Sequence, residues 1–179
     1  MEHIILALLY LKSRTIYEIR TKFEGNLGLM YSSSMGSIQA AVKKLLKAGC
    51  ISYTELVENG KYKKQYTITE TGRERVCQWV NAPFGAAQNK NPELAKLYFM
   101  GLSDKENRCS RIREYIASLQ EYHSTLELLY EEGRVLNPPE EYGELFQFQL
   151  VTIKFGVDSS AFAIEWLSGL AADMEQGKL

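Results

Sequence analysis

The stretch YSSSMGSIQAAVKKLLKAGCI, from Tyr31 to Ile51, decides the fold. Ser34 is a suitable N-cap, because its hydroxyl can accept a hydrogen bond from one of the first free backbone N–H groups of a helix. Gly49 stands where a glycine commonly ends a helix. Between them, five apolar residues recur at the spacing of one helix face: Ile38, Ala41, Val42, Leu45 and Leu46. The stretch therefore predicts an amphipathic helix with a serine-rich N-terminus and lysines on its polar side.

Two more helices are predicted before this stretch. Residues 2–12 form an apolar run of helical length that is too hydrophobic on all sides for a surface helix, so we expect it to be largely buried. Thr15 and Glu18 have the spacing of a capping box, in which each side chain satisfies a backbone N–H of the other residue. A second helix is therefore predicted from Ile16 to about Glu24.

A hairpin and a fourth helix follow. Residues 51–57 and 63–69 read as strands rich in Tyr, Thr, Ile and Val, and the Asn59-Gly60 pair between them is a strong signal for a hairpin turn. Thr69 is the predicted N-cap of a helix that continues to Val80. The order helix, helix, helix, hairpin, helix is that of a winged helix-turn-helix. Three lysines lie near the tip of the wing: Lys61, Lys63 and Lys64.

The charge is distributed unevenly along the chain. Residues 1–80 contain 12 Lys and Arg against 7 Asp and Glu, a net charge of +5. The remaining residues contain 9 against 15, a net charge of −6, so the whole chain carries −1. Such asymmetry favours a basic module that meets a polyanion, joined to an acidic part that does not.

Double-stranded DNA is the partner that this arrangement favours. A helix fits the major groove of B-form DNA with its N-terminal residues nearest the bases, and a lysine-tipped hairpin suits the neighbouring backbone or minor groove. Two alternatives remain. In the first, the serines serve only to cap the helix and the lysines only to keep the surface soluble. In the second, the basic face binds protein or RNA. The candidate DNA-binding residues are Ser33, Ser34, Ser37, Gln39, Lys43, Lys44, Lys61, Lys63 and Lys64.

Residues 1–80 resemble the PadR family of bacterial transcriptional regulators. The resemblance is carried by IILALLYL near the N-terminus, Tyr17-Glu18-Ile19, Gly36-Ser-Ile38, the run from Lys43 to Gly49, Gly60-Lys61, Lys64-Gln-Tyr66, Thr69-Glu-Thr-Gly72-Arg73 and Trp79-Val80. Family members usually have Tyr-Pro where this chain has Gln39-Ala40, and an Arg where Gln65 stands. Because the first departure lies in the recognition helix, it affects the operator sequence more than DNA binding itself.

The acidic part is predicted to be helical. Residues 81–91 read as a linker, after which Asn91-Pro92 begins a helix and Ser103 to Glu106 form a second capping box. The helix that follows carries a coiled-coil-like seam and Pro138-Pro139 ends it, before a last helix from about Glu140 to Met174. Apolar stripes this wide predict burial against a second copy of the chain. The candidate dimerisation residues are Ile112, Ile116, Leu119, Leu126, Phe148, Phe155, Phe162 and Trp166.

A small-molecule effector is a further expectation, taken from the resemblance. The acidic part is similar to the C-terminal region of the longer PadR-type proteins, chiefly at residues 92–99 and 164–167, and family members often respond to phenolic or hydrophobic compounds. This implies Trp79, His123 and Trp166 as candidate effector-binding residues. The plainer interpretation of His123 is a partly exposed or hydrogen-bonded helix residue, and that of Trp166 is a core residue.

Other classes of function have little support. No nucleophile, base and orienting acid occur at a recognisable spacing, and no glycine-rich phosphate loop is present, so we expect no enzyme, no cofactor and no metal. Three dispersed cysteines predict reduced thiols in a cytoplasmic protein, with Cys50 as a buried small hydrophobe. No apolar run is long enough to span a membrane, and no signal peptide is expected.

These observations predict a mainly α-helical protein. We expect a winged helix-turn-helix DNA-binding domain with a two-stranded wing over residues 1–80, a linker over 81–91, and a long-helix dimerisation and effector domain over 92–179. The expected function is that of a homodimeric regulator, a repressor in our interpretation, that binds an inverted-repeat operator. A small effector is expected to relieve the repression. The family contains repressors and activators, and no residue pattern separates them.

Overall fold

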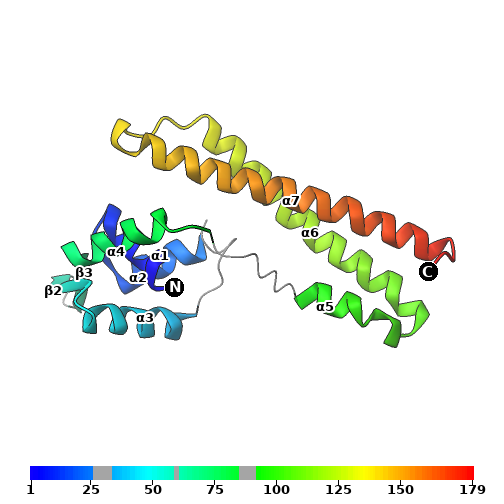
Figure 1. The fold of residues 1–179 in the computed structure, drawn as a ribbon, viewed down its shortest axis with the longest axis horizontal. Coiled ribbons are helices and arrows are strands. Elements are labelled where there is room, and N and C mark those ends of the chain that lie inside the picture. Colours follow the sequence, from blue (N-terminus) through cyan, green and yellow to red (C-terminus); the bar gives the residue numbers. More distant parts are fainter. Residues whose placement is uncertain (26–33, 59–60, 85–91) are drawn as a thin grey trace. The chain divides into compact units, whose positions relative to one another are not determined.

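The structure, a computed structural model, describes residues 1–25, 34–58, 61–84 and 92–179. The chain divides into two compact units, residues 1–87 and 88–179 (Figure 1). The predicted contact residue Ser33, the Asn59-Gly60 turn, the Asn91 cap and most of the predicted linker lie outside the described residues.

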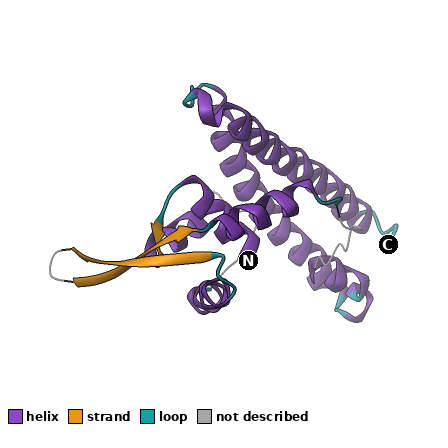
Figure 2. Cartoon of the chain, turned by 60° about the vertical axis from the view of Figure 1, so that its left-hand side comes forward, coloured by secondary structure: helices purple, strands orange, loops and turns teal. Residues whose placement is uncertain are grey.

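The first unit has the element order that the sequence predicts for a winged helix-turn-helix. Its elements are α1 (Glu2–Leu11), β1 (Arg14–Thr15), α2 (Ile16–Glu24), α3 (Met35–Lys47), β2 (Ile51–Glu58), β3 (Lys61–Ile68) and α4 (Glu70–Asn81). The sequence did not predict β1, because two residues are too short to show an alternating pattern. The strands form an antiparallel sheet in the order β1-β3-β2, and β2 and β3 extend as a hairpin beyond the helices of the unit (Figure 2).

The N-terminus of α2 carries the predicted capping box. The Thr15 hydroxyl accepts a hydrogen bond from the Glu18 N–H at 3.2 Å, and the Glu18 carboxylate accepts one from the Thr15 N–H at 2.7 Å, so the capping box is confirmed.

The core of this unit is apolar and comes from every helix and both long strands. The apolar face of α3 is buried as predicted, with Leu46 half-buried at its edge. The buried residues include Ile5, Leu6, Leu9, Ile19, Phe23, Ile38, Ala41, Val42, Leu45, Cys50, Ile51, Tyr66, Ile68 and Val76.

The start of α4 packs tightly against the segment that follows α3. Gly49 has a φ of +66°, which is the left-handed conformation that glycine adopts at little cost. The Thr69 hydroxyl donates to the Gly49 carbonyl at 2.7 Å and accepts from the Gly72 N–H at 3.3 Å. The Thr69 N–H donates to the Cys50 carbonyl at 3.0 Å. These bonds fix the sheet and α4 against the C-terminal end of α3.

The second unit is a pair of long helices with a short helical segment before them. Its elements are α5 (Pro92–Tyr98), the 3-10 turn η1 (Met100–Leu102), α6 (Lys105–Arg134), the 3-10 turn η2 (Glu140–Tyr142) and α7 (Gly143–Glu175). The helices α6 and α7 lie antiparallel along each other (Figure 1). A leucine of the other helix packs directly on each of two glycines, where an added Cβ would lie 2.5 Å from the Leu150 side chain at Gly133 and 3.0 Å from the Leu126 side chain at Gly156.

The predicted capping box at the start of α6 is wrong. The N-cap of α6 is Asp104, and no side chain caps the helix there. Ser103 and Glu106 are therefore each one position too early in the helix for the reciprocal bonds of a capping box, which join the N-cap to the third helical residue. The Arg108 guanidinium binds this segment instead, donating to the carbonyls of Ser103 at 2.7 and 2.9 Å and of Gly101 at 2.8 Å.

Candidate nucleic-acid interface

The N-terminus of α3 is capped by its own serines. The Ser34 N–H donates to the Ser37 hydroxyl at 3.0 Å, and the Ser37 N–H donates to the Ser34 hydroxyl at 3.2 Å. The Ser37 O–H donates to the Ser34 carbonyl at 2.8 Å, which uses its one proton. The Ser34 O–H has no acceptor among the described residues and can donate to an outside group. Since the first turn of α3 contains no acidic residue, this end of the helix suits an anion.

The polar face of α3 is exposed and basic. Gln39 and Lys43 lie on it, four residues apart, and both are exposed. Lys44 is also exposed, but its ammonium lies 3.8 Å from the Glu2 carboxylate of α1, which also binds Arg75 at 3.0 Å. The charge of Lys44 is thus partly balanced within the unit, so Lys43 is the stronger of the two candidate phosphate contacts.

The wing lysines lie on opposite faces of the hairpin. Successive residues of a strand point to opposite sides, so the exposed Lys63 and Lys64 cannot share a face. The Lys64 ammonium lies 4.0 Å from the centre of the Tyr53 ring and 3.8 Å from the Glu55 carboxylate. Hydrogen bonding to Tyr53 is the main cause of a raised pKa for Lys64, and the charge of Glu55 adds to it. The Lys61 side chain lies outside the described residues.

Two exposed apolar side chains near the end of the wing were not predicted as contacts. Tyr62 is 82% exposed and Val57 is 66% exposed, and the two residues are directly opposite each other in the β2–β3 register. The sequence carries a signal for them, because an aromatic residue stands between two lysines in KYKK, but strand propensity accounts equally well for a tyrosine there.

Trp79, the first candidate effector residue, stacks on His3. The two rings lie 5.2 Å apart at 15°, and Trp79 is about half exposed. The His3 Nδ1 atom is buried without a hydrogen-bond partner among the described residues. Burial and, to a smaller extent, the charge of Arg75 lower the pKa of His3, which favours the neutral form of the ring that stacks on the indole.

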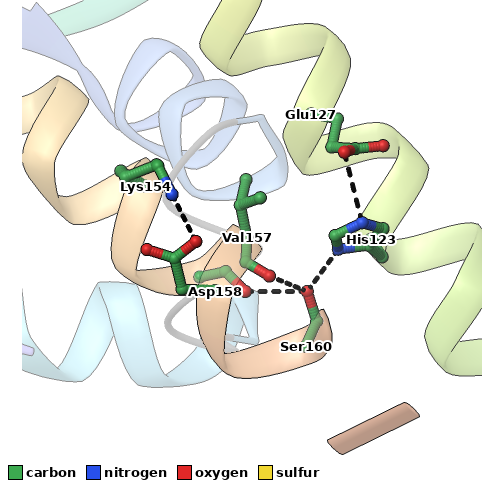
Figure 3. Close-up of polar contacts among 7 residues, drawn as sticks. His123, Glu127, Lys154, Val157, Asp158 and Ser160 are labelled. Carbon is green, nitrogen blue, oxygen red and sulfur yellow. Dashed lines mark hydrogen bonds and ion pairs between the residues drawn. The ribbon is translucent and has the colours of Figure 1, made fainter. Parts of the chain in front are cut away.

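His123 forms a polar layer between α6 and α7. Its Nδ1 lies 2.9 Å from the Ser160 hydroxyl, and its Nε2 lies 3.3 Å from the Glu127 carboxylate (Figure 3). The Ser160 oxygen also lies 2.8 Å and 2.9 Å from the carbonyl oxygens of Gly156 and Val157. The interpretation of His123 as a hydrogen-bonded helix residue is therefore confirmed, and its effector role stays a prediction.

Trp166 lines a groove in the second unit. The groove has a volume of about 1090 Å³ and lies between α5, η1, α6 and α7. Its walls are mainly apolar and also carry three serines and four charged residues, which are Glu93, Lys96, Arg111 and Glu114. His123 is not among the described residues that line it. The apolar lining includes Leu94, Leu97, Met100, Tyr115, Phe162 and Trp166.

The candidate dimerisation residues fall into two groups. Four of them, Ile112, Ile116, Leu119 and Leu126, are buried or half-buried on α6, which packs against α7 of the same chain. The other four lie on α7 and are exposed: Phe148 at 72%, Phe155 at 73%, Phe162 at 68% and Trp166 at 49%. Only the second group, which we call the α7 stripe, leaves apolar surface for another chain.

The described residues give no support to other kinds of site. Cys50 is buried, as predicted. Within the described ranges, no group of three or more His, Cys, Asp or Glu side chains could hold a metal ion. No helix among the same residues is long and apolar enough to cross a membrane.

The element order of the first unit and the exposed basic face of α3 are those of a winged helix-turn-helix protein.

Comparison with known proteins agrees with this class. Residues 5–78 match the transcriptional regulator PadR-like family, and residues 89–175 match the family described as virulence activator alpha C-term. The chain is 23% identical to the negative transcriptional regulator PadR of Bacillus subtilis over 98% of both chains. The crystal structure of that regulator with operator DNA has a TM-score of 0.80 at 20% identity, covering 97% of this chain and 98% of the other. Its structure with p-coumaric acid has a TM-score of 0.76 at 19% identity, with the same coverage.

A PadR-like regulator from Bacillus cereus is similar as well, with a TM-score of 0.78 and 25% identity over 98% of both chains. The chain belongs to the PadR-like family of DNA-binding transcriptional regulators and carries the C-terminal helical domain of its longer members. Members of this family are not enzymes.

Proposed function

We propose that the protein is a cytoplasmic homodimeric repressor that binds an inverted-repeat operator and releases it on binding a small aromatic effector. The observation that carries the proposal is the exposed face of α3, where a capped N-terminus without acidic residues is followed by Gln39 and Lys43. The N-terminal groups suit phosphate oxygens, and an amide side chain on the same helix suits a base edge.

The α7 stripe supports the homodimer. Its four aromatic side chains recur along one face of the helix, and large exposed apolar patches on a soluble protein commonly mark an interface. A two-fold axis through such an interface presents two copies of α3 to successive major grooves, about 34–36 Å apart. An operator with two inverted half-sites follows from this symmetry.

The groove at Trp166 supports the effector. The B. subtilis relative is described with p-coumaric acid, a phenolic carboxylic acid. The mainly apolar walls could take the ring of such a compound, and Arg111, which pairs with Glu114 at 2.7 Å, could exchange this partner for the carboxylate of the compound. Trp79 and His123 have less support as effector contacts, since neither is among the residues that line the groove and His123 already has hydrogen-bond and ion-pair partners on α6 and α7.

A gel-shift titration against DNA from upstream of the protein's own gene tests DNA recognition. We expect saturable binding that weakens steeply with salt, because each phosphate contact releases counterions. Gln39→Ala should alter the preference among operator sequences, whereas the matched control Gln78→Ala, at an exposed glutamine on α4, should leave it unchanged. Binding without sequence preference would favour a general protein- or RNA-binding module over a repressor.

Sedimentation velocity tests the dimer. Phe155→Glu places a charge in the α7 stripe and should convert the dimer to a monomer, while Ala161→Glu adds the same charge at an exposed position on another face of α7. A monomeric wild-type protein at micromolar concentration, or equal behaviour of the two variants, would contradict this assignment.

Fluorescence tests the effector site, because the chain has two tryptophans. Titration with p-coumaric acid should quench the Trp79→Phe variant, in which Trp166 remains, and should leave the Trp166→Phe variant unchanged. The same compound should weaken the gel shift. Quenching of Trp79 alone would move the site to the first unit.

A further inference from the structure

The end of the wing carries an apolar pair on a face whose charges cancel. Tyr62 on β3 and Val57 on β2 are directly opposite, and both side chains are mainly exposed. The next pair on the same face is Lys64 and Glu55, whose charges lie 3.8 Å apart. The pair after it is Tyr53 and Tyr66, with ring centres 6.0 Å apart, where the face enters the core. Toward its tip, this face therefore offers apolar surface and little net charge.

The opposite face of the wing carries a lysine beside a further apolar residue. Lys63 lies on it and is exposed, and its register partner Leu56 is 43% exposed. A hairpin that presents exposed apolar side chains next to a lysine is suited to a ligand with anionic rims and apolar walls. The minor groove of DNA has this character, since phosphates line its rims and deoxyribose rings form its walls. Proteins that enter the minor groove commonly place apolar side chains against it.

We infer that Tyr62, supported by Val57, is an operator contact that packs against deoxyribose rings in the minor groove beside the phosphates that Lys63 contacts. The inference rests on the proposed DNA-binding function and adds a contact residue to it. The net charge of +5 on residues 1–80 favours a nucleic acid over a neutral protein surface as the occupant of this apolar pair.

Salt dependence separates an apolar contact from a phosphate contact. Removing a phosphate contact reduces the slope of log affinity against log salt by about 1 per contact, whereas removing an apolar contact lowers the affinity equally at every salt concentration. Burying a large apolar side chain contributes enough binding free energy that removing the side chain should weaken binding by about tenfold or more.

The experiment measures binding of the full-length protein to its promoter DNA by fluorescence anisotropy over a range of salt concentrations. Tyr62→Thr removes the ring and keeps a residue that favours strands, so the hairpin should be retained. Tyr62→Phe keeps the apolar ring without the hydroxyl. Lys63→Ala removes a charge from the opposite face. Circular dichroism and the thermal midpoint of each variant check that the fold is unchanged.

We expect Tyr62→Thr to lose about tenfold in affinity at each salt concentration with an unchanged slope, Tyr62→Phe to bind like the wild type, and Lys63→Ala to flatten the slope. Wild-type affinity in Tyr62→Thr would overturn the inference and leave the proposed function intact. A flattened slope in Tyr62→Thr would also overturn it, because the tyrosine would then act through a phosphate contact. No saturable binding by the wild type would remove the proposed function and this inference together.

Discussion

Replacing Gly72 with alanine should severely destabilise the DNA-binding unit. A Cβ at this position would lie 2.2 Å from the Cys50 carbonyl oxygen and 2.6 Å from Cγ1 of Ile68. Both distances are far below van der Waals contact. The Cys50 carbonyl also accepts a hydrogen bond from the Thr69 N–H, so it cannot move away without breaking the bond that holds α4 to the sheet.

The size of the effect follows from overpacking. An extra methyl group in a well-packed site costs about 1–3 kcal/mol and occasionally more, and a clash with backbone belongs at the upper end of that range. A unit of this length is stable by only about 4–13 kcal/mol, so a loss of about 3 kcal/mol is a large share of the total. The free energy of unfolding falls by about 1–3 kcal/mol per molar of urea, so the urea midpoint of Gly72→Ala should be lower than that of the wild type by at least about 1 M.

Urea unfolding followed by tryptophan fluorescence measures this loss. A Trp166→Phe background leaves Trp79 as the only tryptophan, so the signal reports on the first unit. Gly36→Ala is the matched control, because an added Cβ there has Ser34 Oγ at 3.9 Å as its nearest neighbour. Alanine is also the better helix former, so this variant should gain up to about 1 kcal/mol. A midpoint for Gly72→Ala equal to that of the wild type would refute the reasoning.

Three further predictions concern titratable and polar groups. The hydrogen bond from a backbone N–H is the main cause that lowers the pKa of Glu18, so its stabilisation exists above the ordinary value of 4.5 and is lost as pH falls through the lower folded value. Glu18→Gln should therefore unfold at lower urea than the wild type at neutral pH, and this difference should shrink in acid. Cys77 is exposed, whereas a carboxylate hydrogen bond raises the pKa of Cys109, so mass spectrometry should find iodoacetamide on Cys77 first. Ser160→Ala removes the partner of His123 Nδ1 and should lower the thermal midpoint of the second unit by an amount equivalent to about 1 kcal/mol.

Local signals in the sequence predicted most of the first unit. The signals that begin and end its helices depend only on residues within one or two turns, so they can be predicted without knowledge of distant parts of the chain. These signals are the Thr15–Glu18 capping box, the Ser34 cap and the glycine at position 49 that ends α3. The same holds for the two long strands, whose composition and spacing place them correctly. The capping box at Ser103 failed because the pattern also occurs one residue out of register with a helix start.

The tertiary structure decided which residues of each pattern remain available to a partner. The sequence treats Lys43 and Lys44 alike, yet only folding brings the Glu2 carboxylate beside Lys44. The seam of α6 and the α7 stripe are both apolar patterns, and only the pairing of the two helices shows that the seam is used within the chain. The sequence by itself determined the winged helix-turn-helix and its basic character, because these follow from local spacing and composition. Exposure and charge pairing needed the structure, because they depend on contacts between residues that are distant in the chain.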